Sequence, residues 1–202
     1  MPEHPRAAFI VLEGGDGAGK TVQAKALCLA LRRDGYKVHP TAEPSRSPVG
    51  RLIRRNFLQR EKTSPEVEAL LFAADRFMHL NSEIRPALAA GKIVVCDRYK
   101  YASFAYQGAQ GVDMKWLHEI NRFADRPHIA IYLDVPPETS LSRLKRKKTV
   151  LERLELQHRV RKEYLKLVRS GELVLINSNR PIEKVSEDIY ALVKRRLRTR
   201  HA

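Results

Sequence analysis

The sequence predicts an α/β protein: a three-layer, doubly wound domain around a five-stranded parallel sheet. Short apolar runs recur along the chain, separated by longer segments with helical spacing of apolar residues. Apolar runs without alternation are typical of parallel strands that are buried on both faces. Helices that join such strands by right-handed crossovers cover both faces of the sheet. The first run also ends at a glycine-rich turn directly before a helical segment, the order of elements around a phosphate-binding loop.

The composition is that of one globular domain, residues 1–202, with an excess of positive charge. Lys and Arg number 38 against 23 Asp and Glu, and the formal net charge of +15 favours anionic partners such as nucleotides, nucleic acid or a membrane surface. No apolar run approaches the length of a membrane span, and Met1–Arg6 lacks a signal-peptide core. Cys28 and Cys96 lie in apolar segments without metal-ligand spacing, which indicates buried free thiols. We therefore expect a cytoplasmic protein.

The first apolar run, Phe9–Leu12, leads into a phosphate loop. The loop matches the pattern G-x-x-x-x-G-K-[ST], and a helical segment, Val22–Arg33, follows at once. Glycines let successive backbone N–H groups turn toward one phosphate, and the first helical turn adds its own N–H groups. In such loops Lys20 reaches the outer phosphates and Thr21 ligates Mg²⁺. A chance glycine-rich turn is the alternative, but strand, loop and helix stand in the required order. We therefore predict a P-loop NTPase fold whose nucleotide site comprises Gly14, Gly15, Asp16, Gly17, Ala18, Gly19, Lys20 and Thr21.

The segment after the first helix predicts a second strand and two helices. The strand is Tyr36–Ala42, and the two prolines of Glu43–Pro48 make the next segment a loop. A basic helix follows over Gly50–Arg60. A longer helical pattern covers Pro65–Ala90, in which Pro86 either kinks the helix or begins a new turn.

The third strand, Ile93–Cys96, ends at Asp97. Ligands of open α/β sheets bind beyond the carboxyl ends of the strands. An acidic residue in that position beside a phosphate loop is the usual second anchor for Mg²⁺. We therefore predict a metal site formed by Thr21 and Asp97.

The remaining chain supplies two more strands and several helices. The predicted strands are Ile129–Asp134 and Leu173–Ile176. The predicted helices are Tyr101–Gly108, Met114–Ala124, one from Glu138, Glu152–Val168, and a last one from Pro181 that ends in a basic run. In this arrangement the phosphate loop follows the central strand of the sheet.

Five segments in order resemble thymidylate kinases, within the P-loop nucleoside-monophosphate kinases. They are Glu13–Asp16, Glu43–Pro44, Leu71–Arg76, Asp97–Tyr99 and Ala105–Gly108. The resemblance covers nearly the whole chain, and five motifs in the right order are far more specific than one. It implies transfer of the γ-phosphoryl group of ATP to dTMP, giving dTDP for dTTP biosynthesis, with Mg²⁺, by a homodimer.

The resemblance also implies how the acceptor nucleotide is bound. Asp16 would accept a hydrogen bond from the 3′-hydroxyl, and Phe72 would stack on the pyrimidine. Arg76 would donate to a base carbonyl, Gln107 would lie along the base edge, and Tyr106 would pack under the deoxyribose. Pro44 and Ser103 complete this predicted set. Each residue has a plainer interpretation, because most phenylalanines on apolar helices belong to the core and most helix arginines are solvated.

The resemblance also implies which residues bind the acceptor phosphate and the adenine of ATP. Arg46 and Arg98 would hold the acceptor phosphate, with Arg98 shared between donor and acceptor. Asn179 and Arg180 fall where the family cradles adenine, and Arg143 where an arginine often stacks on it.

Several departures from the family pattern stand out. Gly17 and Ala18 leave no side chain where many members carry an arginine inside the phosphate loop. Ala102 replaces a common serine, although Ser103 remains, and Ser45 replaces an acid or a glycine.

The missing loop arginine directs attention to a short basic lid at residues 143–155. Transition-state charge on a transferring phosphoryl group needs cations. Arg146 and Arg153 are the lid candidates, beside Lys20, Asp97 and Arg98 as the other predicted catalytic residues. A solvated basic helix has the same composition, so the charge run alone does not decide between the two interpretations.

Two rival functions remain at this level. One is a kinase of the same fold that acts on dUMP, another monophosphate or a nucleoside, since dUMP differs from dTMP by one methyl group. The other is a nucleic-acid-binding P-loop protein, suggested by the net charge and the basic C-terminus. The basic stretches lack interleaved aromatic residues, which argues against a stacking platform for single strands.

Overall fold

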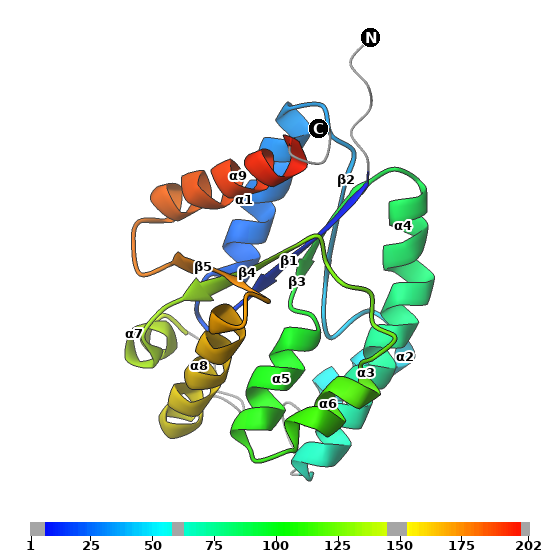
Figure 1. Cartoon of the computed structure of the whole chain (residues 1–202), viewed down its shortest axis with the longest axis vertical. Coiled ribbons are helices and arrows are strands. Elements are labelled where there is room, and N and C mark those ends of the chain that lie inside the picture. Colours follow the sequence, from blue (N-terminus) through cyan, green and yellow to red (C-terminus); the bar gives the residue numbers. More distant parts are fainter. Residues whose placement is uncertain (1–6, 58–62, 145–152, 199–202) are drawn as a thin grey trace.

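The architecture is a five-stranded parallel sheet between two layers of helices (Figure 1). It is seen in a computed structural model, which describes residues 7–57, 63–144 and 153–198. The strands are β1 (Ala8–Glu13), β2 (Val38–Ala42), β3 (Ile93–Asp97), β4 (Ile129–Asp134) and β5 (Val174–Asn177), in the order β2-β3-β1-β4-β5. This confirms the predicted fold class, with the phosphate loop after the central strand β1.

The two faces of β1 belong to two different apolar layers. Ala8, Ile10 and Leu12 pack in a cluster with the helices α1 (Lys20–Arg33) and α9 (Ile182–Arg198). Phe9 and Val11 pack in a second cluster on the opposite face. The helices of that face include α3 (Pro65–His79), α5 (Lys100–Ala109) and α8 (Leu154–Arg169). Burial of both faces explains why the strand reads as an unbroken apolar run.

The other helices are short. They are α2 (Pro48–Leu52), the π-helical turns η1 (Ile53–Phe57) and η2 (Leu80–Ile84), α4 (Arg85–Ala89), α6 (Met114–Ile120) and α7 (Pro137–Ser142). The predicted helix over Pro65–Ala90 is therefore divided into three consecutive helical elements, α3, η2 and α4. Pro86 has no N–H and its ring collides with the carbonyl four residues earlier, so the chain widens into η2 before α4 begins.

Two further expectations can be checked against the described residues. In these ranges no helix is both long and apolar enough to cross a membrane. Cys28 and Cys96 are both buried free thiols, as predicted.

Candidate active site

The carboxyl ends of β1, β2 and β3 border a cavity of about 810 Å³. Leu12 of β1 and Ala42 of β2 both lie in register with Asp97 of β3, so the three strands end at one level. The cavity lining includes Asp16, Gly17, Ala18, Gly19, Lys20, Thr21, Glu43, Asp97, Arg98, Arg143 and Arg180. The fold therefore gathers the predicted phosphate loop, metal pair and donor-side arginines around one space.

Lys20 and Thr21 are the first two residues of α1, and both line this cavity. The Lys20 ammonium donates to the carbonyl oxygens of Gly14 (3.0 Å) and Gly15 (2.7 Å). Burial, with a smaller contribution from the Arg98 charge, lowers the pKa of Lys20 to about 8. The Thr21 hydroxyl donates to Asp97 Oδ2 at 2.6 Å. Two hard oxygen donors, a hydroxyl and a carboxylate beside a phosphate loop, suit Mg²⁺, which binds proteins through few side chains plus substrate phosphates.

The phosphate loop has no room for an additional side chain at Gly17. A Cβ built there lies 1.9 Å from the backbone oxygen of Ser140, in α7, and φ is +81°. Ala18, the next residue, is only 1% exposed. With α7 packed against the loop in this way, a side chain at position 17 would collide with the Ser140 backbone.

Arg98 holds the centre of the site in an unusual backbone conformation. Its φ of 73° makes it the only non-glycine residue in the described ranges with a positive φ. Its Nη2 donates to Asp16 Oδ1 at 2.7 Å and its Nη1 to the Gly14 carbonyl at 3.3 Å. The Tyr106 hydroxyl donates to the other oxygen of Asp16 at 2.7 Å, and the Arg98 guanidinium lies over the Tyr106 ring. One compact cluster thus contains Asp16, Arg98 and Tyr106, three of the residues expected around the sugar and the acceptor phosphate.

Glu13 supports that cluster from behind. Its Oε1 accepts from the backbone N–H of Tyr99 (2.8 Å) and of Ala102 (3.2 Å), and its Oε2 from the Tyr164 hydroxyl (2.9 Å). Burial raises the pKa of Glu13 to about 7, opposed mainly by the Arg98 charge. Glu13 therefore ties the turn after Arg98 to helix α8.

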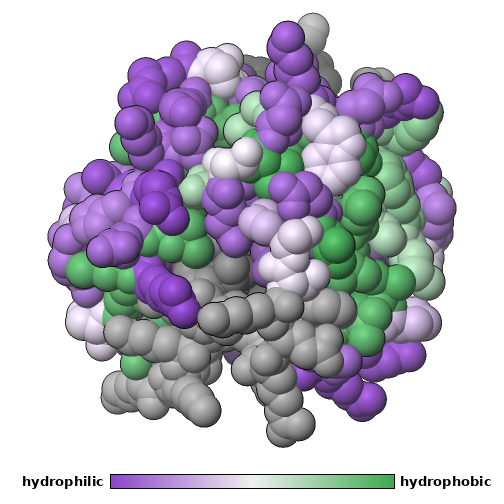
Figure 2. Space-filling view, turned by 90° about the horizontal axis from the view of Figure 1, so that it is seen from below, coloured by the Kyte–Doolittle hydropathy of each residue, from purple (hydrophilic) through white to green (hydrophobic). Residues whose placement is uncertain are grey.

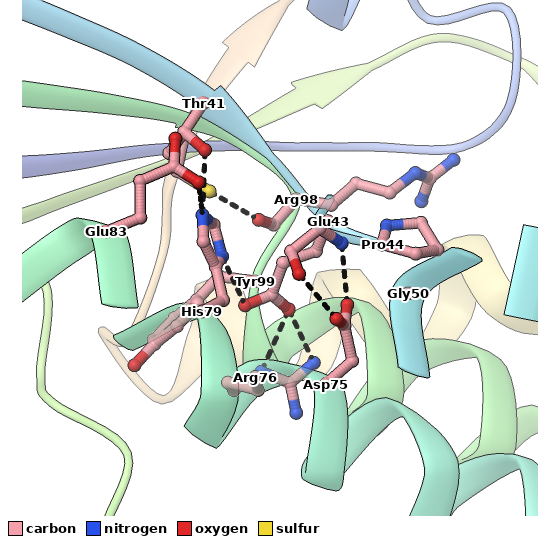
Figure 3. Close-up of polar contacts among 12 residues, drawn as sticks. Thr41, Glu43, Pro44, Gly50, Asp75, Arg76, His79, Glu83, Arg98 and Tyr99 are labelled. Atoms are coloured by element: carbon pink, nitrogen blue, oxygen red, sulfur yellow. Dashed lines mark hydrogen bonds and ion pairs between the residues drawn. The ribbon is translucent and has the colours of Figure 1, made fainter. Parts of the chain in front are cut away.

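Arg76 lies at the centre of a buried polar network (Figure 3). Its Nε and Nη2 bind Glu43 Oε2 at 3.0 and 2.9 Å, and Nη1 and Nη2 donate to Asn121 (2.5 Å) and Ser103 (3.2 Å). The other Glu43 oxygen lies 3.3 Å from His79 Nδ1. In Figure 3 the Glu43 side chain lies between Arg76 and His79. An arginine that is only 1% exposed is not a solvated helix residue, so the plainer interpretation of Arg76 is wrong.

The other predicted acceptor residues are near this network but outside the lining of the large cavity. Phe72 is half-buried and belongs to neither apolar cluster, unlike an ordinary core phenylalanine. Gln107 is buried and donates to Glu68 Oε2 at 3.1 Å. Arg46 is exposed at the tip of the loop after Pro44.

Among the donor-side residues, Arg143 and Arg180 line the cavity. Arg143 Nη2 donates to Asn179 Oδ1 at 3.3 Å, which joins the end of α7 to the segment before α9. Arg180 donates to the Asn177 carbonyl at 3.2 Å and pairs with Asp188. Arg153 is exposed at the N-terminus of α8, and Arg146 lies outside the described residues.

Comparison with known proteins agrees with this geometry. A family model described as thymidylate kinase matches residues 12–189. The chain is 49% identical over 201 residues to a probable thymidylate kinase of Pyrococcus horikoshii, covering 95% of this chain and 98% of the relative. It is 46% identical over 198 residues to a probable thymidylate kinase of Thermococcus kodakarensis, with coverage of 92% and 97%. It is 39% identical over 196 residues to a thymidylate kinase of a Synechococcus species, with coverage of 94% and 95%. The chain belongs to the thymidylate kinase family.

Membership of the thymidylate kinase family confirms the resemblance seen in the sequence. It also confirms the enzyme class, an ATP-dependent nucleoside-monophosphate kinase, over a nucleic-acid-binding P-loop protein. The roles of individual residues in this protein stay predictions.

Sequence reasoning assigned no role to six residues that hold this site in place, although Glu13, Glu43 and Asp75 lie in segments that carry the resemblance. The six are Glu13, Glu43, Asp75, His79, Asn121 and Tyr164. The available signal was an acidic or basic residue directly beside an apolar run, as at Glu13, because a charge there must be buried with partners.

Proposed function

We propose that the protein transfers the γ-phosphoryl group of Mg²⁺-bound ATP to the 5′-phosphate of dTMP and releases dTDP. The observation that carries the proposal is the single cavity that gathers the phosphate loop, Asp97 and Arg98 in a member of the thymidylate kinase family. The acceptor phosphate is already an anion near neutral pH, so the reaction needs no strong general base. Catalysis is then positioning and charge compensation.

Lys20 and Arg98 supply the positive charge on either side of the transferring group. When ATP binds, the Lys20 ammonium replaces its hydrogen bonds to the Gly14 and Gly15 carbonyl oxygens with contacts to the outer phosphates. Arg98, held by Asp16 and the Gly14 carbonyl, faces the same cavity and spans donor and acceptor. Thr21 and Asp97 would hold Mg²⁺, which when bound would neutralise phosphate charge.

The acceptor base lies between Phe72 and the Arg76 network in this proposal. The contacts of Arg76 with Glu43, Asn121 and Ser103 use four of its five N–H groups, and within the described residues one Nη1 N–H is left for a base carbonyl. Asp16 and Tyr106 serve the deoxyribose, and Gln107, oriented by Glu68, serves the base edge.

A further cation comes from the lid segment, residues 143–155. The loop contains no arginine, and the packing of Ser140 leaves no room for one at position 17, so the charge comes from elsewhere. Arg153 and Arg146 are our candidates. Replacing both by Met is expected to lower kcat and leave the dTMP affinity nearly unchanged. A kcat within about a factor of two of wild type would point to Arg46 or Arg51 instead.

The test of the substrate is a steady-state assay with ATP and a panel of nucleoside monophosphates and nucleosides. We expect dTMP to give the highest kcat/KM. The preference over dUMP is worth only about 1–3 kcal/mol, because the two differ by one methyl group. A higher kcat/KM for another monophosphate would overturn the assignment of dTMP.

We further propose that the protein is a homodimer joined through α3. This helix exposes Val67 (41%), Leu70 (49%) and Met78 (40%), which recur with Ala74 at helical spacing along one side. Figure 2 shows hydrophobic residues gathered on the right-hand side of the molecule, where Figure 1 places α3. Burial of such a stripe between two copies removes apolar surface from water. Sedimentation of a Leu70→Arg variant is expected to show a monomer; an unchanged sedimentation coefficient would exclude this surface.

A further inference from the structure

The loop after Pro44 is held by one buried carboxylate. Asp75 Oδ2 accepts from the backbone N–H of Ser45, and its Oδ1 accepts from the hydroxyls of Ser45 and Ser47, each at 2.6 Å. Asp75 is fully buried in α3. Figure 3 shows its carboxylate beside Gly50 and directed at the segment that follows Pro44. The carboxylate therefore fixes the residues on both sides of Arg46.

Residues of α2 and η1 hold the same loop through its backbone carbonyl groups. Arg54 donates to the carbonyl oxygens of Pro44 and of Ser45, the latter at 2.6 Å. Arg51 donates to the Arg46 carbonyl at 2.6 Å. A Cβ at Gly50 would lie 2.1 Å from the Ser45 oxygen and 2.7 Å from Asp75 Oδ1, so only glycine lets α2 approach this closely. The backbone around Arg46 is thus held both by α3 and by the α2–η1 segment.

The neighbouring residue of α3 holds the start of the same loop. Arg76 pairs with Glu43, directly before Pro44, while Asp75 holds Ser45 and Ser47. Two consecutive side chains of one helix therefore clamp one loop at both ends. The Arg46 side chain itself is exposed. A long side chain on a fixed backbone loses less conformational freedom when it binds an anion than one on a mobile loop.

We propose that Asp75 is a positioning residue for the acceptor phosphate, acting through Ser45 and Ser47 to aim Arg46 at it. The proposal rests on the proposed function, in which Arg46 binds the dTMP phosphate. Ser45 stands where relatives carry an acid or a glycine. Because its N–H and hydroxyl both donate to Asp75, this departure contributes to holding the loop and does not weaken phosphate binding. Asp75 touches no substrate itself.

The test is a double-mutant cycle between Asp75→Asn and Arg46→Ala. Asn presents an NH₂ group to donors, so it breaks part of the clamp without a change in volume. We expect Asp75→Asn to raise the KM for dTMP about tenfold, the scale of a lost hydrogen bond to a charged group, with the KM for ATP unchanged. In the Arg46→Ala background the same substitution is expected to add nothing, because residues that act as one unit are not additive.

Matched variants separate positioning from folding. Asp113→Asn is the control, since Asp113 caps α6 by accepting from Trp116 N at 2.8 Å and has no part in the loop; it should leave both KM values unchanged. Ser47→Ala should reproduce the rise in dTMP KM, and Ser47→Thr, which keeps the hydroxyl, should restore it. These two variants carry the test if Asp75→Asn does not fold.

Three results with the Asp75→Asn variant would overturn the inference. They are an equal rise of both KM values, full additivity of Asp75→Asn with Arg46→Ala, and a lower melting temperature with an unchanged KM for dTMP. An Arg46→Ala variant with wild-type KM for dTMP would overturn it as well, while turnover of dTMP by that variant would leave the proposed function standing. A wild-type protein that does not phosphorylate dTMP would instead refute the proposed function itself.

Discussion

Glu13 gives the protein a pH-dependent stability that one substitution should remove. The perturbation is Glu13→Gln, which keeps the shape and an oxygen for the N–H groups of Tyr99 and Ala102 but cannot ionise. The Glu13 pKa is 4.5 in a model peptide and about 7 in the buried site, where Arg98, Lys20 and Tyr164 face it. Between these values the folded protein binds more protons than the unfolded chain. Its free energy of unfolding therefore falls as the pH rises through that window.

The size of the effect follows from the two pKa values. At about 1.4 kcal/mol per pH unit, the interval from 4.5 to about 7 corresponds to about 3 kcal/mol. The assay is urea denaturation of both proteins at pH values from 4.5 to 8. Relative to Glu13→Gln, the wild type should lose about 3 kcal/mol across the window, because other titrating groups cancel in the comparison. A difference between the two proteins that does not change with pH would refute the reasoning.

Three more perturbations test the donor loop and the base site. Lys20→Met should lower kcat by at least about 10²–10³, the scale for one electrostatic donor, with an unchanged melting temperature; near-normal turnover in the purified variant would contradict the mechanism. Phe72→Ala should weaken the binding of dTMP by about 1–3 kcal/mol, the value of one base–aromatic stack, with little change in the KM for ATP. Equal weakening of the binding of both substrates would show that Phe72 has a structural role and does not contact the base. Gly17→Ala should lower the free energy of unfolding by about 2–3 kcal/mol in a denaturant titration. The new Cβ collides with the Ser140 carbonyl, and residue 17 has a positive φ. An unchanged free energy of unfolding would show that α7 can move away from the loop at little cost.

The sheet and the phosphate loop were predictable from sequence because both are local patterns. An unbroken apolar run such as β1 is required wherever a strand is covered on both faces, and here Phe9 and Ile10 face different layers. The loop pattern fixes its own backbone through glycines next to a helix start. The strand order was not predicted; in the structure β3 pairs with β1, and Asp97 at the end of β3 accepts a hydrogen bond from Thr21.

The supporting network was not predictable because its members come from distant segments. Glu43 meets Arg76 and His79 across 33 and 36 residues, and Tyr164 meets Glu13 across 151. No spacing rule relates such positions, since only the packing of α3 and α8 on the sheet brings them together. The π-helical turn at Leu80–Ile84 was not predicted for another reason: Pro86 is compatible either with a kink in one helix or with the start of a new helix.

The left-handed backbone at Arg98 has a consequence for the history and the engineering of this chain. A non-glycine residue in that region costs about 1–2 kcal/mol relative to the common conformations. Glycine at 98 would therefore relieve the backbone and remove the guanidinium that contacts Asp16 and Gly14. Selection for thermal tolerance alone should therefore favour glycine or asparagine at this position, and in the proposed mechanism the resulting protein would be more stable but inactive. Position 98 is thus a point where stability and activity oppose each other, and only a screen that scores both will retain the arginine.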